Sequence, residues 1–296
     1  MSDIAQPLKE MKPEKEFFIG IDSDGCAFDT MEIKHKECFC PNFVEHFSMQ
    51  AVSKYAREVW EFVNLYSKTR GCNRFHAIMR VLHLLGERPQ VKARGVVPPA
   101  MEGVASWIER ETKLGNPTLI AEVERNPHPD LQHALKFSLA VNETIGRVVH
   151  GVPPFPLVRE TLEKITGKAD AIVVSQTPYE ALKREWEEHS IDSFVRLIAG
   201  QEMGTKTEHI AFAAGGKYPR EKMLMIGDAP GDLNAANGND ALFFPINPGA
   251  EEESWKKLYE EGLDRFFAGT YAGPYEQELL IEFNTYLPED PPWRIQ

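Results

Sequence analysis

Two aspartates separated by one residue, Asp22 and Asp24, follow a short apolar run and precede Gly25. On an extended chain, side chains two residues apart point the same way, so both carboxylates can face one pocket. Two carboxylates this close raise each other's cost of ionisation, and the usual remedies are a bound cation or one retained proton. Asp-Gly is also a common turn pair, so a solvated turn at a strand end fits these residues equally well.

A second pair of carboxylates, Asp228 and Asp232, lies in segment 227–232, which also contains two glycines and a proline. Carboxylate oxygens in such a loop suit a hard divalent cation, because such a cation takes oxygen ligands. A turn in which aspartate caps the following helix explains the same residues without a metal. The pair therefore indicates a metal site only in combination with other features.

The segment that begins at Ser175 and Gln176 has groups that can hold an anion. Thr177 and Glu180 fit a capping box, and Pro178 suits the first turn of a helix. The amides at that helix start and the Ser175 hydroxyl would form an anion cradle. Taken alone, a well-capped helix is the better interpretation.

Lys206 stands inside a second capping-box pattern, formed by Thr205 and Glu208, which places it in the first turn of a helix. A cation there opposes the helix dipole at a cost on the order of 0.3 kcal/mol. That local conflict suggests another role for the lysine, such as binding an anion, although surface lysines are common.

These polar residues follow continuous apolar runs, in which apolar and polar residues do not alternate. Such runs are typical of strands buried on both faces of a parallel sheet. Helical patterns at 179–188 and 207–214 separate the later runs, so we expect a Rossmann-like, doubly wound parallel α/β sheet. Ligands bind such sheets at the carboxyl ends of the strands. The expected strands are residues 17–21, 171–174, 223–226 and 241–244.

The stretch between the first two strands predicts helices instead. Apolar residues recur at helical spacing there, as in Phe75, Ile78, Leu82 and Leu85. A Pro-rich connection at 150–156 then ends the helical pattern. We therefore expect a core domain of residues 1–33 and 150–296 and a separate all-helical cap domain of residues 34–149. Within the core, we expect residues 1–15 to be a mobile polar tail, and the chain after a helix at 251–267 to be irregular.

The order of these features resembles the haloacid dehalogenase (HAD) superfamily, in its phosphatase and phosphomutase branch. The stretch IDSDGCAFDT (21–30) is similar to the first motif of that branch, and VVSQT (173–177) is similar to the second. Lys206 matches the third motif and MIGDAPGDLNAA (225–236) the fourth. The segment 153–165 is similar to the part that re-enters the core after a cap. The resemblance covers the core alone; in 34–149 it implies only a helical cap.

The resemblance implies that Asp22 attacks phosphorus and forms an aspartyl-phosphate, which splits one hard displacement into two easier ones. Asp24 would protonate the leaving oxygen and later deprotonate the incoming water. The dehalogenases and the phosphonate-cleaving branch lack this second aspartate. The implied Mg²⁺ ligands are the Asp22 carboxylate, the Asp24 main-chain carbonyl and Asp228, with Asp232 bound directly or through water. The groups implied to hold the phosphoryl oxygens are Ser175, the main-chain amide of Gln176, and Lys206.

We therefore expect a Mg²⁺-dependent phosphatase that hydrolyses a small phosphorylated metabolite. A phosphomutase of the sugar-phosphate type and a catalytically silent HAD-fold binding protein remain as alternatives. A phosphatase for macromolecules is disfavoured, because a large helical lid should admit only small substrates. In the enzymes that this chain resembles, a loop between the first cap helices reads the leaving group. The resemblance therefore implies this role for the cationic loop 65–74, through Lys68, Arg70 or Arg74, and a solvated turn between two helices is the alternative.

The composition excludes several other classes. The formal net charge of −12 repels a phosphate backbone, so we expect no nucleic-acid partner. No run of 18 apolar residues is present, so we expect no transmembrane helix. The polar start of the chain does not fit a signal peptide, and the four cysteines do not fit a disulfide framework. We expect a cytoplasmic enzyme, and the oligomeric state stays open.

Overall fold

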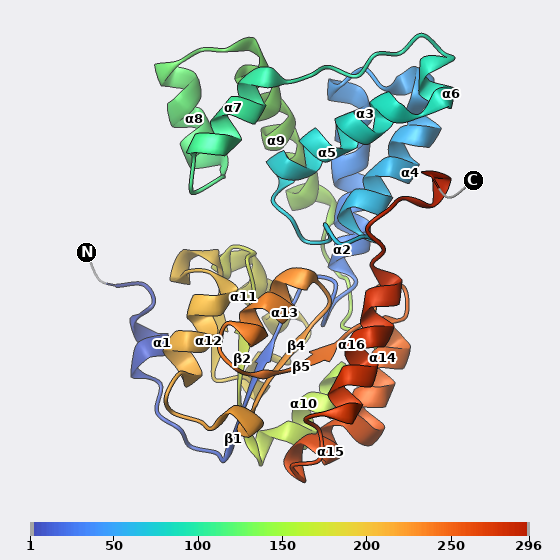
Figure 1. Cartoon of the computed structure of the whole chain (residues 1–296). Helices are drawn as coiled ribbons and strands as arrows, with labels where there is room; N and C mark the ends of the chain where they lie inside the picture. The colour runs from blue at the N-terminus through green and yellow to red at the C-terminus, as the bar shows by residue number, and fades with distance from the viewer. Residues whose placement is uncertain (1–2, 295–296) are drawn as a thin grey trace. The chain divides into compact units, whose positions relative to one another are not determined.

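The computed structural model describes residues 3–294, and its contacts divide the chain into two compact units (Figure 1). The first unit comprises residues 3–30 and 151–288, and the second comprises residues 31–150 together with 289–294. No helix in this described part is both long enough and apolar enough to cross a membrane.

The first unit contains a parallel sheet of five strands in the order β3-β2-β1-β4-β5 (Figure 1). This confirms the doubly wound, Rossmann-like fold class. The strand that the sequence did not reveal is β3, which has three residues and is therefore too short to produce an apolar run. The strand bounds are β1 Phe17–Ile21, β2 Ala169–Val174, β3 Leu197–Ala199, β4 Met223–Gly227 and β5 Leu242–Pro245.

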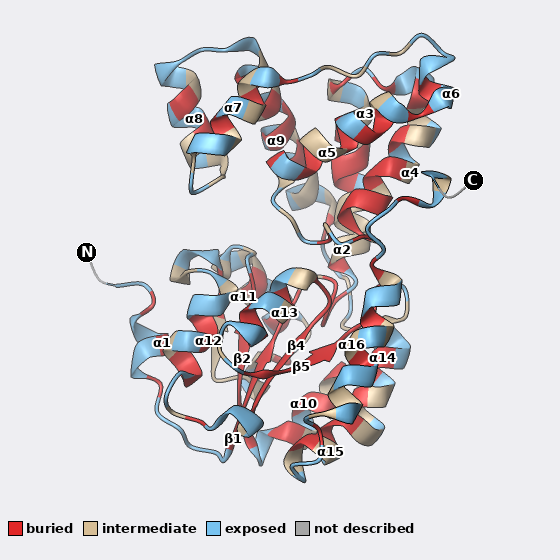
Figure 2. Cartoon of the chain, in the orientation of Figure 1, coloured by how far each residue is buried: buried red, intermediate tan, exposed pale blue. Residues whose placement is uncertain are grey.

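Both faces of this sheet are covered, which explains why the strands lack alternation (Figure 2). Along β1, Phe17, Ile19 and Ile21 belong to one hydrophobic cluster, whereas Phe18 belongs to another. Each cluster collects the helices that cover its face. Helices α10 (Val158–Thr166), α11 (Tyr179–Glu188), α14 (Glu251–Lys257) and α15 (Leu263–Phe267) contribute to the first cluster. Helices α1 (Gln6–Glu10), α12 (Lys206–Ala214) and α13 (Pro230–Asn237) contribute to the second, and α16 (Pro274–Tyr286) contributes to both.

Two expectations for the ends of this unit are wrong. The expected mobile tail contains α1, and its Leu8 and Met11 are buried in the second cluster. The chain after the 251–267 helix forms α16, whose Leu279 and Phe283 are buried. In both segments a few apolar side chains suffice, because a preformed sheet and its helices supply the surface that covers them.

The second unit is all-helical in its described residues and has a hydrophobic cluster of its own around Trp60, Trp107 and Phe137. Its helices are α2 (Thr30–Ile33), whose first residue still belongs to the first unit, α3 (Cys40–His46), α4 (Ser53–Asn64), α5 (Arg74–Glu87), α6 (Pro89–Lys92), α7 (Glu102–Arg110), α8 (Asn116–Arg125) and α9 (Pro129–Val148). This unit also contains the π-helical turn Lys34–Phe39 and the 3₁₀ turns Gln50–Val52 and Pro292–Arg294.

The first unit contains the π-helical turn Leu258–Gly262 and the 3₁₀ turns Asp192–Phe194, Gln201–Met203 and Arg220–Lys222.

The domain limits differ from the expected ones at the carboxyl-terminal end. We expected residues 150–296 to belong to the core, but residues 289–294 pack with the helical unit. The Trp293 ring lies edge-on to Phe62 at 5.4 Å, and the Arg88 guanidinium lies 4.5 Å from its centroid. Arg294 forms an ion pair with Glu87. One aromatic anchor and one ion pair are enough to hold six residues, and neither produces a periodic pattern.

Candidate active site

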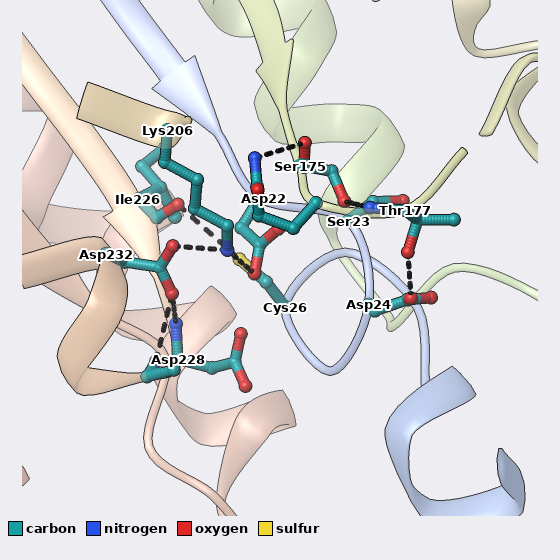
Figure 3. A network of polar contacts seen from close by, with 12 residues as sticks. Asp22, Ser23, Asp24, Cys26, Ser175, Thr177, Lys206, Ile226, Asp228 and Asp232 are labelled. Atoms are coloured by element: carbon teal, nitrogen blue, oxygen red, sulfur yellow. Dashed lines mark hydrogen bonds and ion pairs between the residues drawn. The ribbon is translucent and has the colours of Figure 1, made fainter. Parts of the chain in front are cut away.

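Three of the parallel strands end in polar residues that meet at one edge of the sheet (Figure 3). Asp22 follows β1, Ser175 follows β2 and Asp228 follows β4. Lys206 begins α12, and the predicted capping box of that helix is confirmed, because the Thr205 hydroxyl accepts a hydrogen bond from the Glu208 amide at 3.2 Å. The carboxyl ends of the strands therefore gather the groups that the sequence separates by up to 206 positions.

Lys206 joins two of the carboxylates. Its Nζ lies 2.9 Å from Asp22 Oδ2 and 2.6 Å from Asp232 Oδ1. Burial by itself would lower the pKa of Lys206, but the charges of Asp22 and Asp232 outweigh it and raise that pKa above its usual range. Burial also raises the pKa values of Asp22 and Asp232, with further increases from the neighbouring carboxylates, against the opposing effect of Lys206. The ammonium is thus held charged at a place where acidic groups are crowded.

Asp232 also holds the turn that carries Asp228. Its Oδ2 accepts hydrogen bonds from the main-chain amides of Asp228 at 3.2 Å and Ala229 at 3.0 Å. This arrangement requires glycine at position 227, because a Cβ there would lie 2.3 Å from the Asp232 Cβ. Asp232 therefore fixes both Lys206 and the backbone of the metal-binding candidate Asp228.

Asp22, Asp228 and Asp232 form a group that can hold a metal ion. Each offers a carboxylate oxygen, and these oxygens lie within 4.8 Å of one another. All three residues are buried, so one ammonium faces three carboxylates where water screens little. A divalent cation would offset the excess negative charge, and the all-oxygen donor set suits a hard ion such as Mg²⁺. Because both oxygens of Asp232 already accept hydrogen bonds, Asp22 and Asp228 are the better direct ligands.

The turn after β2 presents Ser175 and Gln176. The buried Ser175 hydroxyl accepts a hydrogen bond from the Thr177 amide at 3.1 Å, which leaves its own proton to be donated. The side chain of Gln176 is turned toward the loop before α12, where its Nε2 donates to the Gly204 carbonyl at 3.0 Å. The turn is thus tied to the segment that carries Lys206.

Asp24 differs from the other carboxylates, because two hydroxyls hold it. Thr177 Oγ1 donates to its Oδ2 at 2.6 Å, and Thr30 Oγ1 donates to its Oδ1 at 2.5 Å. The predicted capping box of Thr177 and Glu180 is wrong: α11 begins at Tyr179 and has no side-chain cap from Thr177. Neither threonine was predicted as a site residue, although both lie inside the motifs IDSDGCAFDT and VVSQT.

The three cationic residues of the helical unit differ in their surroundings. Lys68 is exposed, whereas Arg70 is 3% exposed and its Nη1 donates to the Leu65 carbonyl at 2.8 Å. Arg74 donates to the Ser138 hydroxyl at 2.9 Å and to Asn142 at 2.7 Å, and burial lowers its pKa to about 10. Arg70 thus binds a carbonyl of its own loop, whereas Arg74 binds neutral side chains of a different helix, α9.

Comparisons with known proteins bear on the fold alone. No family profile matches the sequence, and no curated protein does so either. Among solved structures, a protein from Lactobacillus delbrueckii subsp. bulgaricus, provisionally assigned as a phosphoglycolate phosphatase, matches with a TM-score of 0.51 and 16% identity over 85% of this chain and 98% of its own. A haloacid dehalogenase-like family hydrolase from Xanthomonas campestris matches with a TM-score of 0.46 and 12% identity, over 88% of this chain and 96% of that one. The match with a TM-score of 0.51 shows that this chain shares the fold of that structure.

Proposed function

We propose that this protein is a Mg²⁺-dependent phosphatase that hydrolyses a small phosphorylated metabolite through an aspartyl-phosphate on Asp22. The observation that carries the proposal is the buried assembly in which Lys206 contacts both Asp22 and Asp232, with Asp228 alongside (Figure 3). The fold that this chain shares with the Lactobacillus structure, which is provisionally assigned as a phosphoglycolate phosphatase, supports the same class of reaction.

Asp22 supplies the nucleophilic oxygen. Its main-chain amide donates to the Ile226 carbonyl at 3.0 Å, and Lys206 holds one of its carboxylate oxygens, so the group is fixed on both sides. When bound to Asp22, Asp228 and the Asp24 carbonyl, Mg²⁺ would supply positive charge that offsets the carboxylates and stabilises the transferring phosphoryl group. Lys206 and the Ser175 hydroxyl would hold the phosphoryl oxygens.

Asp24 supplies the proton that the leaving oxygen needs. It gives this proton as the ester P–O bond breaks, and it then takes a proton from the water that attacks the aspartyl-phosphate. The second aspartate is what sets hydrolysis or transfer of phosphomonoesters apart from the displacement of halide, which leaves without a proton.

The test is release of inorganic phosphate from p-nitrophenyl phosphate and from a panel of phosphorylated metabolites, with Mg²⁺ and with excess EDTA. We expect Mg²⁺-dependent release from at least one metabolite and none from the Asp22→Asn variant. Rearrangement of a sugar phosphate without net release would indicate a phosphomutase. No turnover of any phosphomonoester, with binding alone, would indicate a silent binding protein and contradict the proposal.

A further inference from the structure

The carboxyl group of Asp24 is held by hydroxyls from two separate segments (Figure 3). Thr177 lies in the turn after β2, 153 positions along the chain, and its hydroxyl donates to Oδ2 at 2.6 Å. Thr30 lies at the start of α2, is fully buried, and donates to Oδ1 at 2.5 Å. Each carboxylate oxygen therefore has its own donor, and the direction of the carboxyl group is set from both sides.

Thr177 makes this contact in place of the role that its sequence position predicts. A threonine before a helix, followed three residues later by glutamate, usually caps the helix. Here the amide of Tyr179 donates to the Glu202 carboxylate at 3.0 Å, so a neighbouring loop supplies that cap. The Thr177 hydroxyl is thereby left to bind Asp24.

The main chain of Thr177 is fixed as well. Its amide donates to the Ser175 hydroxyl at 3.1 Å, and its carbonyl accepts from the Gln201 amide at 3.1 Å. One residue thus connects the hydroxyl that would bind phosphate to the carboxyl group that would move the proton. A displacement of this turn changes the position of both.

We propose that Thr177 is a positioning residue that directs Asp24 at the leaving oxygen. This inference rests on the proposed phosphatase function and on Asp24 as its general acid and base. Thr177 keeps its own proton throughout and acts only through the orientation of Asp24. Its removal should therefore matter most where the leaving group needs a proton most.

The experiment compares two esters with the full-length protein and Mg²⁺. Glycerol phosphate has an alkoxide leaving group that requires protonation, whereas p-nitrophenolate leaves readily without it. For Thr177→Val, which keeps the shape and removes the hydroxyl, we expect kcat/KM on glycerol phosphate to fall about 10- to 100-fold, within what a general acid contributes. We expect kcat/KM on p-nitrophenyl phosphate to change less than about 3-fold, because kcat/KM reports only the formation of the aspartyl-phosphate, where general-acid assistance is small for this ester. The later hydrolysis of the aspartyl-phosphate, in which Asp24 acts as base, is common to both esters and affects kcat instead.

Three variants complete the test. Thr177→Ser should restore the rate on glycerol phosphate, and Thr30→Val should show the same preference for the better leaving group. Thr161→Val is the matched control, because Thr161 is buried in α10 and its hydroxyl has no hydrogen-bond partner in the described chain. Its rates on both esters should equal those of the wild type.

Equal losses on the two esters, or no rescue by serine, would overturn the role of Thr177 and leave the phosphatase function intact. An absence of Mg²⁺-dependent hydrolysis of either ester by the wild type would instead contradict the proposed function, and this inference with it. Thermal melting of each variant separates both outcomes from loss of folding.

Discussion

Replacement of Asp170 by asparagine should destabilise the core strongly. Asp170 is 2% exposed at the amino-terminal end of β2, opposite the edge that carries the candidate site. Its Oδ2 accepts from the amides of Glu14 and Lys15 at 2.8 and 2.9 Å and from the Tyr218 hydroxyl at 2.6 Å. Its Oδ1 accepts from Arg196 at 2.9 Å. One carboxylate thus joins four parts of the chain.

The size of the effect follows from these four contacts. A hydrogen bond to a charged group contributes about 1.5–3 kcal/mol, but contributions that share one group do not add fully. Asparagine can keep its oxygen toward the three donors at the Oδ2 position, so the contact with Arg196 is lost to a clash between two donors, and the other three lose the negative charge. We therefore expect Asp170→Asn to lower the free energy of unfolding by about 3 kcal/mol at neutral pH, comparable to breaking a buried ion pair.

The effect should depend on pH in a defined direction. Burial by itself would raise the pKa of Asp170, but the hydrogen bonds from Tyr218, Lys15, Glu14 and Arg196 outweigh it and lower that pKa below its usual value. As the pH falls, the unfolded chain therefore binds the proton first. The stabilisation is fully present above the unfolded pKa of about 3.9 and is lost as the pH falls through the lower folded pKa.

Urea denaturation of both proteins at pH 7 and at a series of values below 4 measures this. The difference between wild type and Asp170→Asn should be largest at pH 7 and should shrink as the pH falls below 4. Asp240→Asn is the matched control, because Asp240 is exposed and its ion pair with Arg220 spans 3.9 Å, so we expect a change below about 0.5 kcal/mol. A difference under about 1 kcal/mol at pH 7, or one that does not vary with pH, would contradict this stabilising role of the Asp170 carboxylate.

The remaining predictions concern catalysis. Asp22→Asn should abolish turnover with the fold intact by circular dichroism, and a residual rate above about a thousandth of wild type would exclude covalent catalysis. Excess EDTA should abolish phosphate release, Mg²⁺ should restore it and Ca²⁺ should do so poorly because its coordination shell is larger and looser; full activity in EDTA would be incompatible with a metal. Arg74→Ala should raise the barrier by about 2–4 kcal/mol for a natural substrate with a second anion and change p-nitrophenyl phosphate hydrolysis little, as measured by kcat/KM. Arg70→Ala should instead lower the melting temperature and reduce both activities equally, because its guanidinium binds the Leu65 carbonyl of its own loop.

The sheet and the residues at its edge could be predicted from the amino-acid sequence. Unbroken apolar runs predicted four of the five strands, because a strand buried on both faces carries apolar side chains on both of them. Asp22, Ser175 and Asp228 come directly after such runs. Because the carboxyl ends of parallel strands meet at one edge of the sheet, these residues were expected to lie together. The capping box at Thr205 placed Lys206 correctly, since a helix start is decided by neighbours in sequence.

The hydrogen-bond partner of each polar group could not be predicted in this way, because it depends on contacts between distant segments. The Thr177 hydroxyl could cap α11 by every local rule, yet it binds Asp24, because Glu202 from another loop already serves the Tyr179 amide. The same holds for α1 and for residues 289–294, whose few apolar side chains are ordered by surfaces distant in sequence. Local sequence patterns predict periodicity and helix caps. A hydrogen bond between distant segments depends instead on which of the competing donors and acceptors the fold places within reach.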